Sequence, residues 1–210
     1  VIQLTGDSEI EYEGSGSAFI VEDGGSLVIK GQSAGSGKSM KDGAAGGTVI
    51  EANEPVEALF KVGPGATLEL ENVTLIGENK PHCGLIILYN PTEDPDNGPV
   101  IKLTDVRAVA SKSVITTYAH EEANDFCSWS FAPGCMHWAY ATVEIKGGYF
   151  EKTSEDAYFG NENCIFLYAC KGLIEGAEVV SRKGACIEVS RSDLSGEAFK
   201  IKDCTVTSNY

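Results

Sequence analysis

The chain has 210 residues, of which 42% are hydrophobic, so it is long enough to bury one substantial core. Its 31 acidic and 16 basic residues give a formal net charge of -15, which repels phosphate backbones and anionic lipid surfaces alike. Nucleic acids are therefore poor partners, and the longest apolar run is far shorter than the roughly 20 residues that cross a bilayer. We expect a single domain over 1–210, with no membrane span.

Two segments in the first third of the chain share one pattern. FIVEDGGSLVIKG begins at Phe19 and FKVGPGATLELEN begins at Phe60, and each contains apolar residues, a glycine turn and then alternating apolar residues. A pattern that recurs in this way indicates a repeating structural unit.

The second half of this unit recurs along the rest of the chain. Each copy reads apolar, any, apolar, any, then Asn, Asp or Gly, with an apolar residue three positions further on. Gly172 is the exception, at the first apolar place of its copy. The equivalent aliphatic residues are Ile29, Leu70, Leu103, Ile145, Ile174 and Ile201, separated by 41, 33, 42, 29 and 27 residues. We expect these side chains to form one column inside a coiled ribbon.

A second set of short apolar strands lies between these copies. Its members are TVIEA (48–52), GLIILY (84–89), SVITTY (113–118), NCIFLY (163–168) and ACIEVS (185–190). Each repeat therefore carries two strand signals, with variable loops inserted between them. Period-two alternation predicts one buried face for each strand, and the Asn, Asp or Gly position predicts a bend.

The repeated bend decides between two all-β architectures. The strands of a β-sandwich have no reason to repeat one bend residue at a fixed place in every unit. We therefore predict a single-domain, right-handed parallel β-helix of about six coils with loop insertions, in which equivalent strands pair in parallel about 4.8 Å apart.

The rung FKVGPGATLELENVTLIG (60–77) resembles those of right-handed parallel β-helix proteins of the pectin-lyase-like superfamily. The resemblance covers most of 17–207 and concerns the fold. GGTVI (46–50), GACI (184–187) and TVTSN (205–209) are more weakly similar to rung motifs of polymorphic outer-membrane and algal surface repeat proteins. Superfamily enzymes that cleave acidic polysaccharides use clustered carboxylates, often with calcium, beside a basic residue. No catalytic residue carries over, because the aspartates at the bend position are isolated.

Seven cysteines and the sequon Asn72-Val73-Thr74 favour a secreted or cell-surface glycoprotein with disulfides. The alternative is a set of buried thiols that act as small hydrophobes, together with a sequon that arose by chance. Because the number of cysteines is odd, at least one is free or is paired outside the chain.

The acidic loop NPTEDPDNGP (90–99) offers oxygen donors of the kind that calcium binds. The metal-ligand candidates in it are Asp94, Asp96 and Asn97. Their spacing does not match the standard calcium loop, so a proline-rich acidic turn is the alternative. We expect no other cofactor.

A long insertion, 119–140, interrupts the regular rungs. Cys127 and Cys135 bracket seven residues within it, and a disulfide between them would add roughly 2 to 3 kcal/mol by the chain-entropy estimate. Its aromatic residues include Trp129, Phe131, Trp138 and Tyr140. These rings would present a binding surface to a sugar or a partner chain. The alternative is that they cover one side of the solenoid.

Cys164 and Cys186 occupy equivalent places in successive strands, so we expect them to stack on each other. Spacing leaves open whether they are bonded, because facing side chains on stacked strands are close but point the same way.

Neither end of the chain carries an amphipathic capping helix. VIQLTGDSEIEY (1–12) begins as strand without a methionine or an apolar leader, and FKIKDCTVTSNY (199–210) stops just after a rung. Because end coils of a solenoid expose strand edges, we expect either a longer polypeptide or ends that stack on neighbours.

These features together predict an extracellular, non-catalytic β-helix module with a structural, assembly or adhesive role. Its expected partners are further copies of itself, other surface proteins or a glycan. The alternative is a calcium-dependent polysaccharide lyase or hydrolase of pectate-lyase type. A cluster of three or more carboxylates beside a Lys or Arg on one outer face would favour that alternative.

Overall fold

The computed structural model describes 2–3, 8–12, 16–22, 24–32, 48–52, 58–77, 84–92, 94–117, 139–155 and 163–209. These residues form twenty β-strands and one short 3-10 helix, η1 (Ser192–Ser195), and they contain no α-helix. All strand pairs are parallel, and the strands belong to three sheets, A, B and C.

Sheet A consists, in spatial order, of β1 (Ile2–Gln3), β4 (Ser26–Lys30), β7 (Thr67–Glu71), β10 (Val100–Thr104), β13 (Thr142–Lys146), β16 (Lys171–Glu175) and β19 (Lys200–Lys202). Sheet B consists of β2 (Ser8–Tyr12), β5 (Thr48–Ala52), β8 (Thr74–Gly77), β11 (Arg107–Ala110), β14 (Tyr149–Lys152), β17 (Glu178–Ser181) and β20 (Thr205–Ser208). Sheet C consists of β3 (Phe19–Val21), β6 (Phe60–Val62), β9 (Gly84–Leu88), β12 (Ser113–Thr117), β15 (Ile165–Tyr168) and β18 (Ile187–Ser190).

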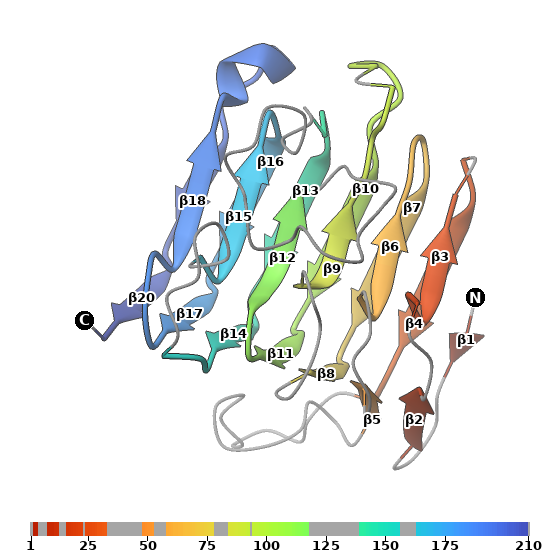
Figure 1. The fold of residues 1–210 in the computed structure, drawn as a ribbon, viewed down its shortest axis with the longest axis vertical. Coiled ribbons are helices and arrows are strands. Elements are labelled where there is room, and N and C mark those ends of the chain that lie inside the picture. The colour runs from red at the N-terminus through yellow and green to blue at the C-terminus, as the bar shows by residue number, and fades with distance from the viewer. Residues whose placement is uncertain are drawn as a thin grey trace.

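The chain passes through sheets A, B and C in turn, because neighbours in each sheet are three strands apart in sequence. This arrangement is a parallel β-helix of about six coils, as predicted. Figure 1 shows the coils side by side from the red N-terminal strands to the blue C-terminal strands, with the two termini at opposite ends of the stack.

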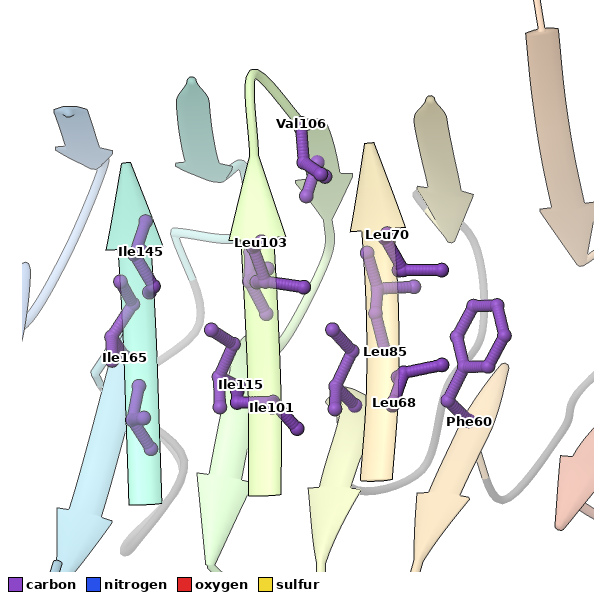
Figure 2. Close-up of a cluster of buried hydrophobic side chains, with 14 of the residues drawn as sticks. Phe60, Leu68, Leu70, Leu85, Ile101, Leu103, Val106, Ile115, Ile145 and Ile165 are labelled. Carbon is purple, nitrogen blue, oxygen red and sulfur yellow. The ribbon is translucent and has the colours of Figure 1, made fainter. Parts of the chain in front are cut away.

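The predicted aliphatic column is confirmed by the register of sheet A. Leu70 pairs with Ile29 on one side and with Leu103 on the other. The register then continues through the remaining three members, Ile145, Ile174 and Ile201. Figure 2 shows Leu70, Leu103 and Ile145 on successive strands, with their side chains inside the coil.

Sheets B and C contribute columns of the same kind, and the three sets meet in one core. The sheet B column is Ile10, Ile50, Leu75, Ala108, Phe150, Val179 and Val206. The sheet C column is Phe19, Phe60, Ile86, Ile115, Ile165 and Ile187. Burial of one such side chain stabilises the fold by roughly 1.5 to 3 kcal/mol, so the columns are the main source of stability.

The bend predicted at the Asn, Asp or Gly position lies at the corner between sheets A and B. Five of the six corner residues have positive φ, namely Asn72 (53°), Asp105 (50°), Gly147 (66°), Gly176 (69°) and Asp203 (53°). Asn, Asp and Gly are the residues that adopt this left-handed conformation at least cost. Gly31 meets a different need, because a Cβ atom there would lie 2.2 Å from the carbonyl oxygen of Asn72.

Each coil has three strands, and the prediction of two strand signals per repeat was therefore wrong. The residues after each A–B corner form separate strands in sheet B, since the bend ends the sheet A strand after three to five residues. TVIEA is β5 of sheet B, whereas the other members of its predicted set lie in sheet C. The apolar alternation continues across the corner, so the sequence pattern does not show where the sheet A strand ends and the sheet B strand begins.

Gly172, which departs from the repeat pattern, lies opposite Val143 in the pairing of β13 with β16. A Cβ atom on Gly172 would lie 1.9 Å from the carbonyl oxygen of Val143, and the glycine has a φ of +136°. The apolar column is interrupted here because the two backbones approach too closely for any side chain.

Candidate functional site

The C-terminal end of the helix exposes residues of columns that are buried in the middle coils. Ile201 is 50% exposed and Val206 is 53% exposed, although both belong to columns that are fully buried in the middle of the helix. The reason is that β19 and β20 each pair with a strand on one side only, among the described residues. We call β18, β19 and β20 the open end.

Charged groups flank the apolar residues of the open end. Lys202 Nζ lies 2.6 Å from Glu175 Oε1 and 3.5 Å from Asp203 Oδ2. The hydrogen bond with Glu175 raises the pKa of Lys202, and the same contact lowers the pKa of Glu175. Lys202 is exposed and Glu175 is partly exposed, so the pair contributes little to stability and mainly fixes where the positive charge lies.

At the N-terminal end of the helix, residues of the same columns lie beside acidic side chains. In β2, the half-buried Ile10 packs against the core, and the exposed Glu9 and Glu11 flank it in the sequence. In β3, Phe19 stacks on Phe60 with ring centroids 5.0 Å apart, while Ile20 points outward and is 57% exposed.

A polar cluster follows the outer face of sheet B across neighbouring coils. The Tyr149 hydroxyl donates to Glu151 Oε2 at 2.8 Å, and Arg182 Nη2 lies 3.4 Å from Glu151 Oε1. The Arg107 guanidinium carbon is 6.0 Å from the centre of the Tyr149 ring, a cation–π contact. Burial, and then the hydrogen bond to Glu151, raise the pKa of Tyr149 well above its usual range.

The polar groups of this cluster bind one another. Tyr149 stays protonated and donates to Glu151, and the Glu151 carboxylate has Tyr149 and Arg182 as its two partners. Arg107 Nε is the exception, because within the described part of the chain it is buried and has no hydrogen-bond partner. Sequence analysis missed the cluster because its members lie on three coils and come together only through the strand register.

The acidic loop before β10 is an ordered turn in the structure. Asp94 Oδ1 accepts a hydrogen bond from the backbone N–H of Asp96 at 3.0 Å, which is the pattern of an Asx turn. The carbonyl oxygen of Asn97 accepts one from the N–H of Gly65 at 2.8 Å, so the loop is tied to the neighbouring coil. Calcium binding by this loop stays a prediction. Among the described residues, no group of three or more His, Cys, Asp or Glu side chains is placed to hold a metal ion.

Asn90, which sequence analysis missed, holds this loop against the residues that precede β13. Its side chain is 1% exposed, and Nδ2 donates to the carbonyl oxygens of Asp94 at 3.0 Å and Ala139 at 3.1 Å. Tyr140 follows directly, half-buried and with a φ of 48°. The remaining members of the predicted aromatic surface and its disulfide, Trp129, Phe131, Trp138, Cys127 and Cys135, lie outside the described residues.

Cys164 and Cys186 stack on each other as predicted, and both are free thiols. They directly precede the register pair Ile165 and Ile187, and the N–H of Ile165 donates to the carbonyl oxygen of Cys186 at 2.9 Å. Cys186 Sγ donates to the carbonyl oxygen of Thr207 at 3.1 Å. Burial raises the pKa of both thiols, which makes them poor nucleophiles.

Lys152 is a buried cation inside the helix, and sequence analysis did not single it out. It is 1% exposed, and Nζ donates to the carbonyl oxygens of Ser154 at 3.2 Å and Lys183 at 3.0 Å. It therefore ties together the turns that leave sheet B in two successive coils. A signal was present in the sequence, because Lys152 is two residues after Phe150 and so shares its inward face.

The sequon places Asn72 at an A–B corner, where it is half-buried. Thr74, the third residue of the sequon, is 1% exposed as the first residue of β8. Glycosylation of Asn72 stays a prediction, and it would require the sequon to be recognised before the coil closes.

The fold and these contacts define a parallel β-helix in which, among the described residues, the strands at both ends of each sheet pair on one side only. No family model matches the chain, no curated protein matches it, and no solved structure matches it. None of the helices in the described ranges is long and apolar enough to cross a membrane.

Proposed function

We propose that the protein is an extracellular, non-catalytic β-helix module whose role is assembly or adhesion. The observation that carries this proposal is the open end, where Ile201 and Val206 are about half exposed. An unpaired strand edge beside exposed apolar side chains is a template for pairing with another strand. Its partners would be further copies of the chain, other surface proteins or a glycan.

The outer face of sheet A supports a structural role, because its charges stabilise neighbouring coils. Lys30 Nζ lies 2.8 Å from Glu71 Oε2 and 3.3 Å from Glu69 Oε1, both on the next strand of the sheet. The hydrogen bond with Glu71 is the largest cause of the raised pKa of Lys30. Such cross-strand pairs favour the correct register over a slipped one.

The proposed extracellular setting comes from the sequence. Seven cysteines and the sequon at Asn72 support a secreted or cell-surface protein. The rung pattern that resembles the pectin-lyase-like superfamily, and the weaker similarity to outer-membrane and algal surface repeats, support the same setting. Expression in a secretory eukaryotic host tests it. A glycan at Asn72 would give a mass loss on glycosidase treatment that Asn72→Gln abolishes, and an unmodified secreted chain would contradict the glycoprotein proposal.

The assembly role is tested by blocking the open end. In the double variant Ile201→Asp, Val206→Asp, association with another strand edge would bury two carboxylates, which is strongly unfavourable. A matched control, Thr67→Asp with Thr142→Asp, adds the same charge to the outer face of sheet A in the middle of the helix.

Sedimentation velocity over a range of protein concentrations gives the readout. We expect the wild-type chain and the control to associate, and the double variant to associate at least tenfold more weakly. Circular dichroism checks that all three proteins are folded. A wild-type chain that stays monomeric at every concentration, or a control that loses association equally, would overturn the proposal.

A further inference from the structure

We propose that Cys164 and Cys186 together form a two-thiolate binding site for Cu(I), a soft monovalent metal ion. The inference is independent of the proposed assembly function. It rests on the spacing of the two cysteines, on the buried cation beside them and on the chemistry of thiolate ligands.

The two cysteines lie one above the other in successive coils. They directly precede the register pair Ile165 and Ile187, and the N–H of Cys164 donates to the carbonyl oxygen of Ala185 at 2.9 Å. Both side chains belong to the hydrophobic core and are 0% and 4% exposed. Side chains stacked in this way on paired strands are about 4.8 Å apart.

This spacing suits a metal ion better than a disulfide. The sulfur atoms of a disulfide are about 2.05 Å apart, so both side chains would have to turn toward each other. A metal ion between two thiolates, with metal–sulfur bonds of roughly 2.3 Å, holds the sulfurs about 4.6 Å apart. That distance is close to the spacing between coils, so a linear two-coordinate ion bridges them with little movement of either strand.

Two buried thiolates also select the class of metal ion. Soft thiolate ligands favour Cu(I), whereas calcium takes six to eight oxygen ligands and zinc takes about four ligands. Among the described residues, no third His, Cys, Asp or Glu side chain is grouped with the pair. The pair is therefore suited to Cu(I), for which two thiolates are a sufficient set of ligands.

Lys152 supplies the charge that such a site needs. One Cu(I) ion replaces two thiol protons, so the bound complex RS–Cu–SR carries one negative charge and two protons are released. A buried negative charge is costly unless a cation pairs with it. Lys152 is 1% exposed, and the carbonyl oxygens of Ser154 and Lys183 hold its ammonium group in place. Burial raises the pKa of the Cys164 thiol, and the charge of Lys152 acts in the opposite direction.

The other groups near the two sulfurs act in both directions. Burial raises the pKa of Cys186, and a backbone hydrogen bond with Ser181 lowers it. The hydrogen bond from Cys186 Sγ to the carbonyl oxygen of Thr207, 3.1 Å long, is lost when the metal replaces the proton. Glu151 raises the pKa of Cys164, but this carboxylate is on the outer face of β14 and lies 3.4 Å from Arg182 Nη2. Lys152 is therefore the cation that offsets the charge of the bound complex.

Copper binding by the reduced protein tests the site. The wild type, Cys164→Ser and Cys186→Ser are titrated with Cu(I) without oxygen, against a coloured Cu(I) chelator. Cys170→Ser is the matched control, because Cys170 is also a buried free thiol. We expect the wild type and the control to bind one more tight equivalent of Cu(I) than either variant of the pair. Circular dichroism checks that all four proteins are folded.

Retention of that equivalent in either variant of the pair, or its loss in the folded control, would overturn the inference. X-ray absorption at the copper edge adds a measurement on the wild-type chain that needs no variant. With one equivalent of Cu(I) we expect two sulfur neighbours and no nitrogen or oxygen neighbour. A third ligand of any kind would also overturn the two-thiolate site.

The variant Lys152→Met separates the charge of Lys152 from its structural role. Between two thiolates Cu(I) gives an anionic complex, whereas Hg(II) gives a neutral one. We therefore expect this variant to bind Cu(I) about tenfold more weakly or worse, and to bind Hg(II) as tightly as the wild type does. Equal weakening for both ions, or for neither, would overturn the assignment of Lys152 as the balancing charge.

Discussion

Ile145 and Ile201 have the same place in the repeat, yet one is in the closed middle of the helix and the other at its open end. Both belong to the sheet A column, and both have Ile174 as a register partner. Ile145 is 0% exposed because Leu103 covers its other side, whereas Ile201 is 50% exposed. The repeat pattern therefore fixes which way a side chain points, and only the next coil decides whether it is buried.

This difference in burial means that column residues of the closed coils contribute to the stability of the fold, whereas those of the open end would contribute to association. In the closed coils, apolar burial is already complete and stabilises the fold. At the open end, part of the same free energy becomes available only when another strand covers the edge. The two regions should therefore respond differently to identical substitutions, and three experiments examine this difference in order of decreasing effect.

The largest difference is expected between Ile145→Ala and Ile201→Ala. The first leaves a cavity in a fully buried column and should lower the free energy of unfolding by about 2 to 5 kcal/mol. The second removes a half-exposed side chain and should cost less than about 1 kcal/mol. Urea denaturation of dilute protein measures both. Equal losses would show that Ile201 is covered in solution, and repetition at high concentration would reveal whether a second copy covers it.

A smaller effect should appear in the pH dependence of stability. Burial raises the pKa of Cys170 to about 12, although its backbone hydrogen bonds act in the opposite direction. In the unfolded chain a thiol ionises near a pKa of about 8.5. The contribution of Cys170 is therefore fully present below about pH 8.5 and is lost as pH rises toward about 12.

The test compares the wild-type chain with Cys170→Ala at pH 7 and pH 10. The wild type should lose up to about 2 kcal/mol more unfolding free energy between these values than the variant, as each pH unit above the unfolded pKa is worth about 1.4 kcal/mol. The measurement at pH 7 controls for the packing change. Identical pH slopes would mean that the Cys170 thiol is accessible to water in the folded chain.

The smallest effect concerns the corners, where the closed and open regions should agree. Asp105 and Asp203 have φ values of 50° and 53°, so their backbone strain is local and does not depend on a covering coil. Asp105→Ala and Asp203→Ala should each cost about 1 kcal/mol, while Asp105→Gly should change stability by less than about 0.5 kcal/mol. Chemical denaturation measures all three. A much smaller cost for Asp203→Ala would indicate that the open end frays in the folded protein.

The sequence predicted the fold well because the columns and corners depend on short-range chemistry. Alternation placed Leu70 and its equivalents on one face, and Asn72 marked a corner through its tolerance of positive φ. The third strand of each coil was missed, because apolar alternation continues through the corner without a change in composition. Gly31 shows another limit, since its residue type fits the bend pattern but its role is close backbone approach.

The candidate site was predicted less completely. Alternation in FKIKDCTVTSNY placed Ile201 in the sheet A column, but the exposure of Ile201 and Val206 follows from strand neighbours that only the structure shows. The cluster around Tyr149 could not be predicted, because its members meet only through register across separate coils.

The sequence by itself determined the repeat, the direction of each column and the residues that turn the corners, since these depend on residue type and on period-two geometry along the chain. Only the tertiary structure decided which columns are covered, which thiols are buried and where Lys152 finds its carbonyl partners. The physical reason is that burial and hydrogen bonding between coils depend on neighbours 20 to 50 residues away, and variable loops set which residues those are.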